Sequence, residues 1–221
     1  MVNLSKFSGF GATGQKVRSA LIDSLTAEGV TNAQVKQVMK STPRHFFIDD
    51  ALSRQAYRNI TLPIGFSQTI SQPLIVGLMT QAVVEGDCGN ILEIGSGCGY
   101  QTAVLAQIFD KVYSVERIQG LYNKAKKKLA ELGLNNIELS YGDGFDVKKY
   151  QDNFFDAIML TAAPEYIPDK LLKKLKKGGR LVAPVGSDNG QKLVKMSFDG
   201  IKITKKEIAD VIFVPLISGI E

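Results

Sequence analysis

Three glycines at alternate positions, Gly95, Gly97 and Gly99, follow a short apolar run at residues 91–94. Glycine has no Cβ, so a ligand can approach the main-chain amides of such a loop directly. From Tyr100 onward apolar side chains recur at helical spacing, and the first N–H groups of a helix are free to bind a ligand. The sequence therefore predicts a strand, a glycine turn and a helix that together form a ligand site.

A carboxylate stands where a nucleoside could be held. Glu116 ends the next apolar run, residues 112–115, about 20 residues after Gly95. At the end of a second strand it could accept hydrogen bonds from both ribose hydroxyls. Alternatively, Glu116 caps the following helix and pairs with Arg117 or Lys124. Its combination with the glycine loop favours the nucleoside interpretation.

The spacing of the glycines separates two kinds of cofactor. A dinucleotide site has the pattern G-x-G-x-x-G, and here Tyr100 occupies the position of the third glycine. The pattern G-x-G-x-G after hydrophobic-Glu-hydrophobic instead resembles the first motif of the class I S-adenosylmethionine-dependent methyltransferases. A dehydrogenase is therefore the least favoured function.

A second polar stretch, residues 62–73, precedes an apolar helix that is predicted to run from Leu74 to about Val84. Ser71 is a natural N-cap for this helix and Pro73 suits its first turn, which is a purely structural explanation. The hydroxyl and the free amides at such a helix start would also suit a carboxylate. Both interpretations stay open at this point.

The elements that must position these residues follow from the apolar periodicity. Strands are predicted at residues 91–94, 112–115, 137–141, 155–161 and 180–185, with an antiparallel hairpin of residues 192–198 and 207–214. Helices are predicted at residues 16–28, 31–40, 74–84, 118–132 and 168–175, and from Tyr100. The second of these helices begins with a capping box of Thr31 and Gln34, and residues up to Gly14 are expected to form a loose tail.

This alternation predicts a single α/β domain over residues 1–221. Its fold is a doubly wound, mostly parallel Rossmann-like methyltransferase sheet with an antiparallel C-terminal edge and an N-terminal helical cap. We assign the cap and the substrate loop to residues 1–72. The cofactor-binding core and the C-terminal hairpin then occupy residues 73–221.

Composition limits the partners. The net charge of +5 comes largely from lysines at residues 124–128 and 173–177, which read as solvated helix faces without interleaved aromatic residues. No apolar stretch approaches the ~20 residues of a membrane span, and the first residues do not read as a signal peptide. One histidine and two cysteines in no metal spacing predict no metal site. We expect a cytoplasmic monomer with neither a nucleic-acid nor a membrane partner.

Beyond the glycine loop, nearly the whole chain resembles the protein-L-isoaspartate O-methyltransferase family. Its most specific segment is Thr69-Ile70-Ser71-Gln72-Pro73. The other matching segments are Pro43-Arg44-His45-Phe46, Leu62-Pro63-Ile64-Gly65, residues 92–102 (LEIGSGCGYQT), Val115-Glu116-Arg117, Gly142-Asp143-Gly144, Thr161-Ala162-Ala163-Pro164 and Phe213-Val214-Pro215-Leu216. The resemblance implies a repair enzyme that transfers a methyl group from S-adenosyl-L-methionine to the free α-carboxylate of isoaspartyl residues in damaged proteins and peptides. The methyl ester would then lead through a succinimide to repair.

For the substrate, the resemblance implies that Ser71 is the catalytic residue. Thr69 would help Ser71 to hold the substrate carboxylate, and Ile70 and Val214 would complete the substrate site. One position departs from the family, since Ser67 stands where glycine is frequent. If that glycine has a positive φ, the loop of this chain is expected to follow a different path.

For the cofactor, the resemblance implies that Glu93 supports the glycine loop, that Glu116 holds the ribose and that Asp143 receives the adenine amine. A simple glycine-flanked turn is the competing explanation for Asp143. The other expected cofactor-binding residues are Gly95, Ser96, Gly97, Gly99, Gly144 and Thr161.

The proposed chemistry suits a chain with a single histidine. A carboxylate with a pKa of ~4 is ionised at neutral pH, so its methylation by a sulfonium needs no general base. Two alternatives remain: a methyltransferase that acts on RNA or a small metabolite, and a non-catalytic module that senses a nucleoside.

Overall fold

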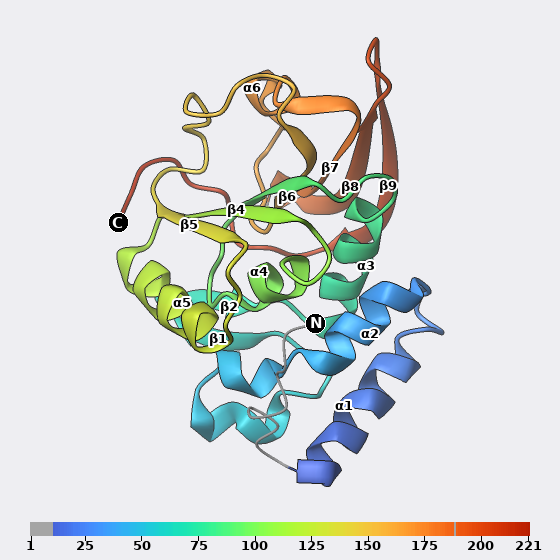
Figure 1. The fold of residues 1–221 in the computed structure, drawn as a ribbon, viewed down its shortest axis with the longest axis vertical. Coiled ribbons are helices and arrows are strands. Elements are labelled where there is room, and N and C mark those ends of the chain that lie inside the picture. The colour runs from blue at the N-terminus through green and yellow to red at the C-terminus, as the bar shows by residue number, and fades with distance from the viewer. Residues whose placement is uncertain (1–10, 188) are drawn as a thin grey trace.

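A seven-stranded sheet forms the centre of the computed structural model, which describes residues 11–187 and 189–221 (Figure 1). The strand order is β5-β4-β3-β6-β7-β8-β9; the first five strands in this order are parallel, and β8 and β9 are antiparallel. The strands are β3 (Asn90–Ile94), β4 (Lys111–Glu116), β5 (Ile137–Tyr141), β6 (Phe155–Leu160), β7 (Leu175–Ser187), β8 (Gly190–Phe198) and β9 (Ile203–Val211). The predicted mostly parallel sheet with an antiparallel C-terminal edge is confirmed.

Continuous apolar runs explain the central position of β3 and β6. Every residue of β6 is buried, as is every residue of β3 after Asn90, which is typical of strands covered on both faces. On one face Ile91 joins a cluster with residues of α3 (Pro73–Val83), α4 (Tyr100–Leu105) and α5 (Gln119–Glu131). On the other face Leu92 packs in a second cluster with Leu171 of α6 (Asp169–Leu172). The sheet is therefore doubly wound.

The N-terminal part forms a helical cap below α3, α4 and α5 in Figure 1. It contains α1 (Gly11–Ser24), α2 (Ala33–Ser41) and the 3-10 helices η2 (Arg44–Phe47) and η3 (Asp50–Gln55). An antiparallel hairpin of β1 (Leu62–Gly65) and β2 (Gln68–Ile70) connects this cap to α3. The cap is as predicted, whereas the hairpin was not predicted.

Two helix starts differ from prediction. α1 begins at Gly11, so residues 11–14 are helical rather than a loose tail; the rest of the expected tail lies outside the described residues. α2 is capped by Asn32, whose side chain accepts a hydrogen bond from the Val35 N–H. Thr31 lies one residue before this cap, so the predicted capping box of Thr31 and Gln34 is wrong.

Ser71 is not a helix cap either. Gln72 is the N-cap residue of α3, and it makes no side-chain capping hydrogen bond. Pro73 is the first helical residue, as predicted, because the helix start needs no N–H there. The structural explanation of Ser71 as an N-cap is therefore wrong.

The helix predicted at residues 168–175 is shortened by strand pairing. α6 ends at Leu172, and Leu175 begins β7, where it is fully buried and pairs with Phe155. Lys176 then forms an ion pair with the buried Asp156, 2.9 Å between Nζ and Oδ2. Tertiary pairing thus overrides the helical pattern of this lysine-rich segment.

The C-terminal hairpin is confirmed, although β9 ends at Val211 rather than at the predicted Val214. Residues 212–216 leave the sheet and run beside the loop after β6. Two main-chain hydrogen bonds hold this segment to Ala163. The Ala163 N–H donates to the carbonyl oxygen of Val214, and the Leu216 N–H donates to the carbonyl oxygen of Ala163, each at 2.8 Å. Among the described residues, no helix is long and apolar enough to cross a membrane.

Candidate active site

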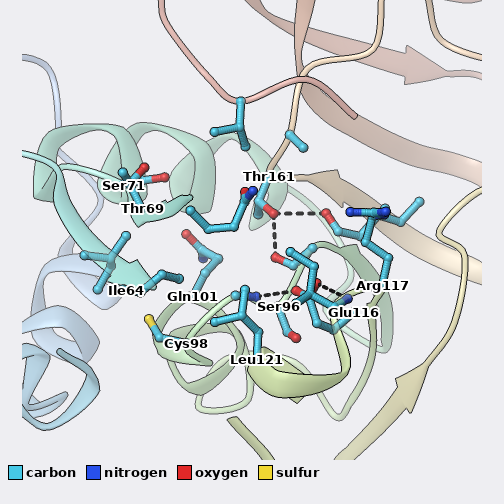
Figure 2. A pocket seen from close by; sticks show the side chains of 18 of the residues that line it. Ile64, Thr69, Ser71, Ser96, Cys98, Gln101, Glu116, Arg117, Leu121 and Thr161 are labelled. Atoms are coloured by element: carbon cyan, nitrogen blue, oxygen red, sulfur yellow. Dashed lines mark hydrogen bonds between the residues drawn. The ribbon is translucent and has the colours of Figure 1, made fainter. Parts of the chain in front are cut away.

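A cavity, here called the main cavity, lies at the carboxyl ends of β3, β4 and β6 (Figure 2). Its walls come from the β1–β2 hairpin, the glycine loop, the start of α5 and residues 214–217. In parallel α/β sheets this edge is where ligands bind. The topology thus brings together segments that are far apart in the sequence.

A second cavity, here called the side cavity, adjoins the main cavity. It is lined by Thr61, Thr69, Ser71, Gln72, Ile75, Thr161, Val211, Ile212, Phe213 and Val214. Four of these residues, Thr69, Ser71, Thr161 and Val214, also line the main cavity. A ligand in the main cavity and a ligand in the side cavity would therefore meet at these four residues.

The glycine loop has a conformation that other residues rarely adopt. Gly95, Gly97 and Gly99 have φ values of 97°, 53° and 89°. A Cβ on Gly95 would lie 2.4 Å from Oγ1 of Thr161, so the loop needs glycine there for space as well as for conformation. Gly99 is the N-cap residue of α4, which leaves the amides of the loop at a helix start.

Glu116 holds the glycine loop at the end of β4. Its Oε2 accepts a hydrogen bond from the Gly97 N–H at 2.8 Å, and its Oε1 accepts one from the Ile118 N–H at 2.9 Å. Arg117 instead pairs with Glu221, and among the described residues Glu116 forms no ion pair with Arg117 or Lys124, so that part of the alternative is wrong. The bond from the N–H of Ile118, the N-cap residue of α5, agrees with the other part, in which Glu116 caps this helix. The carboxylate is 4% exposed and lines the main cavity, where each oxygen keeps a lone pair for a ligand hydroxyl.

Glu93 lies beneath the loop rather than in the cavity wall. Its Oε2 accepts hydrogen bonds from the hydroxyls of Thr102 and Ser114, at 2.5 and 2.6 Å, and so connects α4 to β4. The side chain is fully buried, and this burial raises the pKa of the carboxyl from 4.5 to about 7.

Two hydroxyls complete the wall around the loop. The Thr161 Oγ1 lies 2.5 Å from the carbonyl oxygen of Gly95 and 3.0 Å from that of Ile94. Ser96 lines the main cavity, is 4% exposed, and its hydroxyl has no hydrogen-bond partner among the described residues. A buried hydroxyl without a partner is costly, so this one suits a bound polar ligand.

Asp143 is engaged by the protein itself. Its Oδ1 accepts a hydrogen bond from the Phe145 N–H, and its Oδ2 accepts one from the Gly219 N–H, both at 2.7 Å. Gly144 lines the main cavity, whereas the described lining does not include Asp143. Asp143 therefore fastens the C-terminal segment across the cavity, and its contact with adenine remains a prediction.

The hydroxyl side chains of Thr69 and Ser71 lie next to each other at one end of the main cavity (Figure 2). Neither hydroxyl forms a hydrogen bond with another described residue. Ile70, between them, is 5% exposed and anchors the strand in the core. Two free donors that point into the same space can bind a carboxylate.

Gln101 was not predicted as a site residue. It points into the main cavity between the Thr69–Ser71 pair and Ser96 (Figure 2), and its Nε2 donates to the buried Thr80 Oγ1 at 3.0 Å. Its position in the first turn after the glycine loop is the signal that could have identified it.

The hairpin turn crosses from the cap to α5. Phe66 and Ser67 both have φ values of 54°, so Ser67 itself takes the left-handed conformation and the expected change of path is unnecessary. The Phe66 ring lies against Gly120, where a Cβ would be 2.1 Å from the ring, and the Lys124 Nζ is 5.2 Å from the ring centroid. The hairpin therefore covers one side of the main cavity.

Comparison with known proteins assigns the chain to a family. The family model described as protein-L-isoaspartate(D-aspartate) O-methyltransferase matches residues 15–221. A protein-L-isoaspartate O-methyltransferase from Idiomarina loihiensis is 46% identical over 209 residues, which cover 94% of this chain and 98% of that protein. One from Pseudomonas aeruginosa is 45% identical over 208 residues, with the same coverage.

Solved structures share the fold. A chain from Plasmodium falciparum, crystallised with S-adenosyl-L-homocysteine, has a TM-score of 0.78 and 23% identity, covering 90% of this chain and 98% of that chain. A second, named protein-L-isoaspartate O-methyltransferase, has a TM-score of 0.79 and 24% identity, covering 90% of this chain and 65% of that chain. With its fold shared and nearly its whole length matched, the chain belongs to the protein-L-isoaspartate(D-aspartate) O-methyltransferase family.

Proposed function

We propose that this protein transfers a methyl group from S-adenosyl-L-methionine to the free α-carboxylate of L-isoaspartyl residues in damaged proteins and peptides. The observation that carries the proposal is the meeting of two cavities at Thr69 and Ser71. One cavity contains the glycine loop and Glu116, and the other is lined by hydroxyls. The methyl ester would then cyclise to a succinimide, which begins repair.

The residues around the glycine loop fit this cofactor. Gly95 and Gly97 line the main cavity, where a methionine portion could approach their main chain, and the unpartnered hydroxyl of Ser96 offers it a hydrogen bond. Gly99 is outside the described lining and would act through the loop conformation, since its φ is 89° and a Cβ there would press against Leu129 of α5. Glu116 would accept the ribose hydroxyls with its remaining lone pairs. Gly144 and Thr161 would complete the wall, and Asp143 would act at the adenine end. When bound, S-adenosyl-L-methionine supplies a methyl group on a positively charged sulfur.

The other side of the junction would orient the acceptor. We assign Ser71 as the catalytic residue, because its hydroxyl and that of Thr69 would donate to one carboxylate oxygen and leave the other directed at the methyl carbon. Ile70 fixes the strand that carries them, and Val214 would bound the acceptor from the opposite wall. Attack requires the reacting atoms to be aligned about 3–3.5 Å apart before transfer, and positioning supplies most of the rate.

The transfer needs no general base. The acceptor carboxylate is already ionised at neutral pH, and one of its oxygens forms a bond to the methyl carbon as the carbon–sulfur bond breaks. The bonding electron pair stays on sulfur, so a negative and a positive charge disappear together. The described lining of the side cavity accordingly holds hydroxyls and an amide but no histidine or acidic residue.

Transfer of labelled methyl tests the proposal. An isoaspartyl peptide and the same peptide with normal aspartate would be incubated with the protein and labelled S-adenosyl-L-methionine. We expect base-labile label on the isoaspartyl peptide alone. Label on neither peptide, with cofactor binding demonstrated by calorimetry, would overturn the proposed acceptor and leave RNA, a metabolite or nucleoside sensing.

A further inference from the structure

The side cavity has two unlike walls. The β1–β2 hairpin, the residues that flank it and the loop after β6 contribute polar side chains: Thr61, Thr69, Ser71, Gln72 and Thr161. Residues 211–214 form an apolar wall opposite, and the described lining contains no charged side chain. The polar wall is suited to one carboxylate, and the apolar wall to hydrocarbon.

Ile212 stands out on the apolar wall because it is 94% exposed. Its two neighbours fix this outward position. Val211 is 8% exposed and pairs with Gln191 at the end of β9, and the Gln191 side chain binds both main-chain groups of Phe213, at 2.7 and 3.0 Å. The chain therefore holds an aliphatic side chain in water at the rim of the side cavity.

The covalent structure of an isoaspartyl residue determines what reaches this rim. In such a residue the peptide chain continues through the side-chain carbonyl, and the α-carboxylate is a short branch. If the branch enters the side cavity to reach Ser71, the polypeptide must lie across the cavity mouth. The residues adjacent to the isoaspartyl residue then lie at the rim, where Ile212 is exposed.

We infer that Ile212 contacts the side chain adjacent to the isoaspartyl residue and gives the enzyme a preference for an apolar residue there. The inference rests on the proposed function. An exposed aliphatic side chain is favourable to cover, and the uncharged lining offers a charged neighbour no partner.

The test compares two isoaspartyl peptides that differ only in the flanking residues, leucine in one and serine in the other. For the unmodified protein we expect kcat/KM to be about fivefold higher for the leucine peptide. In Ile212→Ser this ratio falls to within twofold, whereas Ile212→Leu restores it.

Ile201→Ser is the matched control. Ile201 is 95% exposed, yet it lies in the turn between β8 and β9 and lines neither cavity. We expect this variant to keep the fivefold ratio. An equal ratio in Ile212→Ser and in the unmodified protein would overturn the inference. Methylation of neither peptide would overturn the proposed function as well, so the two failures are distinguishable.

Discussion

Beside the glycine loop, two polar side chains of the main cavity are hydrogen-bonded to the loop, whereas two hydroxyls at the junction with the side cavity have no partner among the described residues. Glu116 and Thr161 contact main-chain groups of the glycine loop. Thr69 and Ser71, in contrast, have hydroxyls without partners among the described residues and belong to a small hairpin and the loop after it. Under the proposed function, the first pair is preorganised for a cofactor of constant shape, and the second can adapt to varied polypeptides.

Of the substitutions considered, Gly95→Ala should reduce activity most, because it distorts the glycine loop. The new Cβ would lie 2.4 Å from the Thr161 Oγ1, and φ at this position is 97°. We expect kcat/KM for S-adenosyl-L-methionine to fall at least ~100-fold, because loop misplacement is costly to alignment. Gly133→Ala is the control, since it has φ 69° but nothing within 4 Å; it should lose ~1 kcal/mol of stability and no activity. Full activity of Gly95→Ala would show that cofactor binding does not require the glycine conformation at position 95.

Glu93→Gln would test the raised pKa of the buried carboxyl beneath the glycine loop. Burial raises the Glu93 pKa from 4.5 to about 7, so between these pH values the folded state binds more protons than the unfolded state. Stability contributed by this group is present below pH 4.5 and is lost as the pH rises to about 7.

The glutamine variant cannot ionise, so its unfolding free energy should lose ~2 kcal/mol less than that of the unmodified protein between pH 5 and 8. Urea unfolding at both pH values measures this difference. Identical pH dependence in the two proteins would contradict the raised pKa.

Ser71→Ala should affect acceptor binding at the junction of the two cavities and leave the glycine loop unchanged. We expect kcat/KM for an isoaspartyl peptide to fall about tenfold, which corresponds to one lost hydrogen bond to a charged group, with cofactor affinity unchanged. Ser96→Ala provides the opposite pattern, because its hydroxyl lies on the cofactor side. It should weaken cofactor binding in calorimetry and leave the peptide KM unchanged. If both variants changed the same kinetic parameter, Ser71 and Ser96 would not serve different ligands.

Ser67→Gly should have the smallest effect, a gain in the stability of the hairpin that carries Thr69. Ser67 has φ 54°, a conformation that glycine adopts without strain, so we expect the glycine variant to gain up to ~1 kcal/mol. For a chain of this length this raises Tm by ~2–4 °C. Ser67→Ala keeps the strain and should give no gain. Equal stabilisation by alanine would show that the serine hydroxyl, rather than the backbone, is unfavourable.

The sequence alone predicted the parts of this molecule that depend on local pattern. The apolar runs that became β3 and β6 are continuous because both faces are covered, and the glycine spacing identified the loop between β3 and α4. Leu175 was misassigned because its pairing with Phe155, a contact between distant residues, decides its conformation.

Within the site, the residue types predicted which side chains lie there but not their hydrogen-bond partners. Asp143 was expected at the adenine, and nothing local indicates that Gly219 takes one of its oxygens. Gln101 was missed although it stands in the first turn after the glycine loop, because the residue type alone does not show where its side chain points. Its orientation depends on the hydrogen bond to Thr80 of α3, a contact between different elements that no local pattern predicts.

The contact between Phe66 and Gly120 links the turn of the β1–β2 hairpin to the start of α5. A Cβ at position 120 would lie 2.1 Å from the ring, so the phenyl ring occupies the space that a side chain at position 120 would need. This pair should therefore covary among homologues: a larger residue at position 120 should occur with a small residue at position 66. The hairpin that carries the acceptor site and the helix beside the cofactor site would then diverge together during evolution.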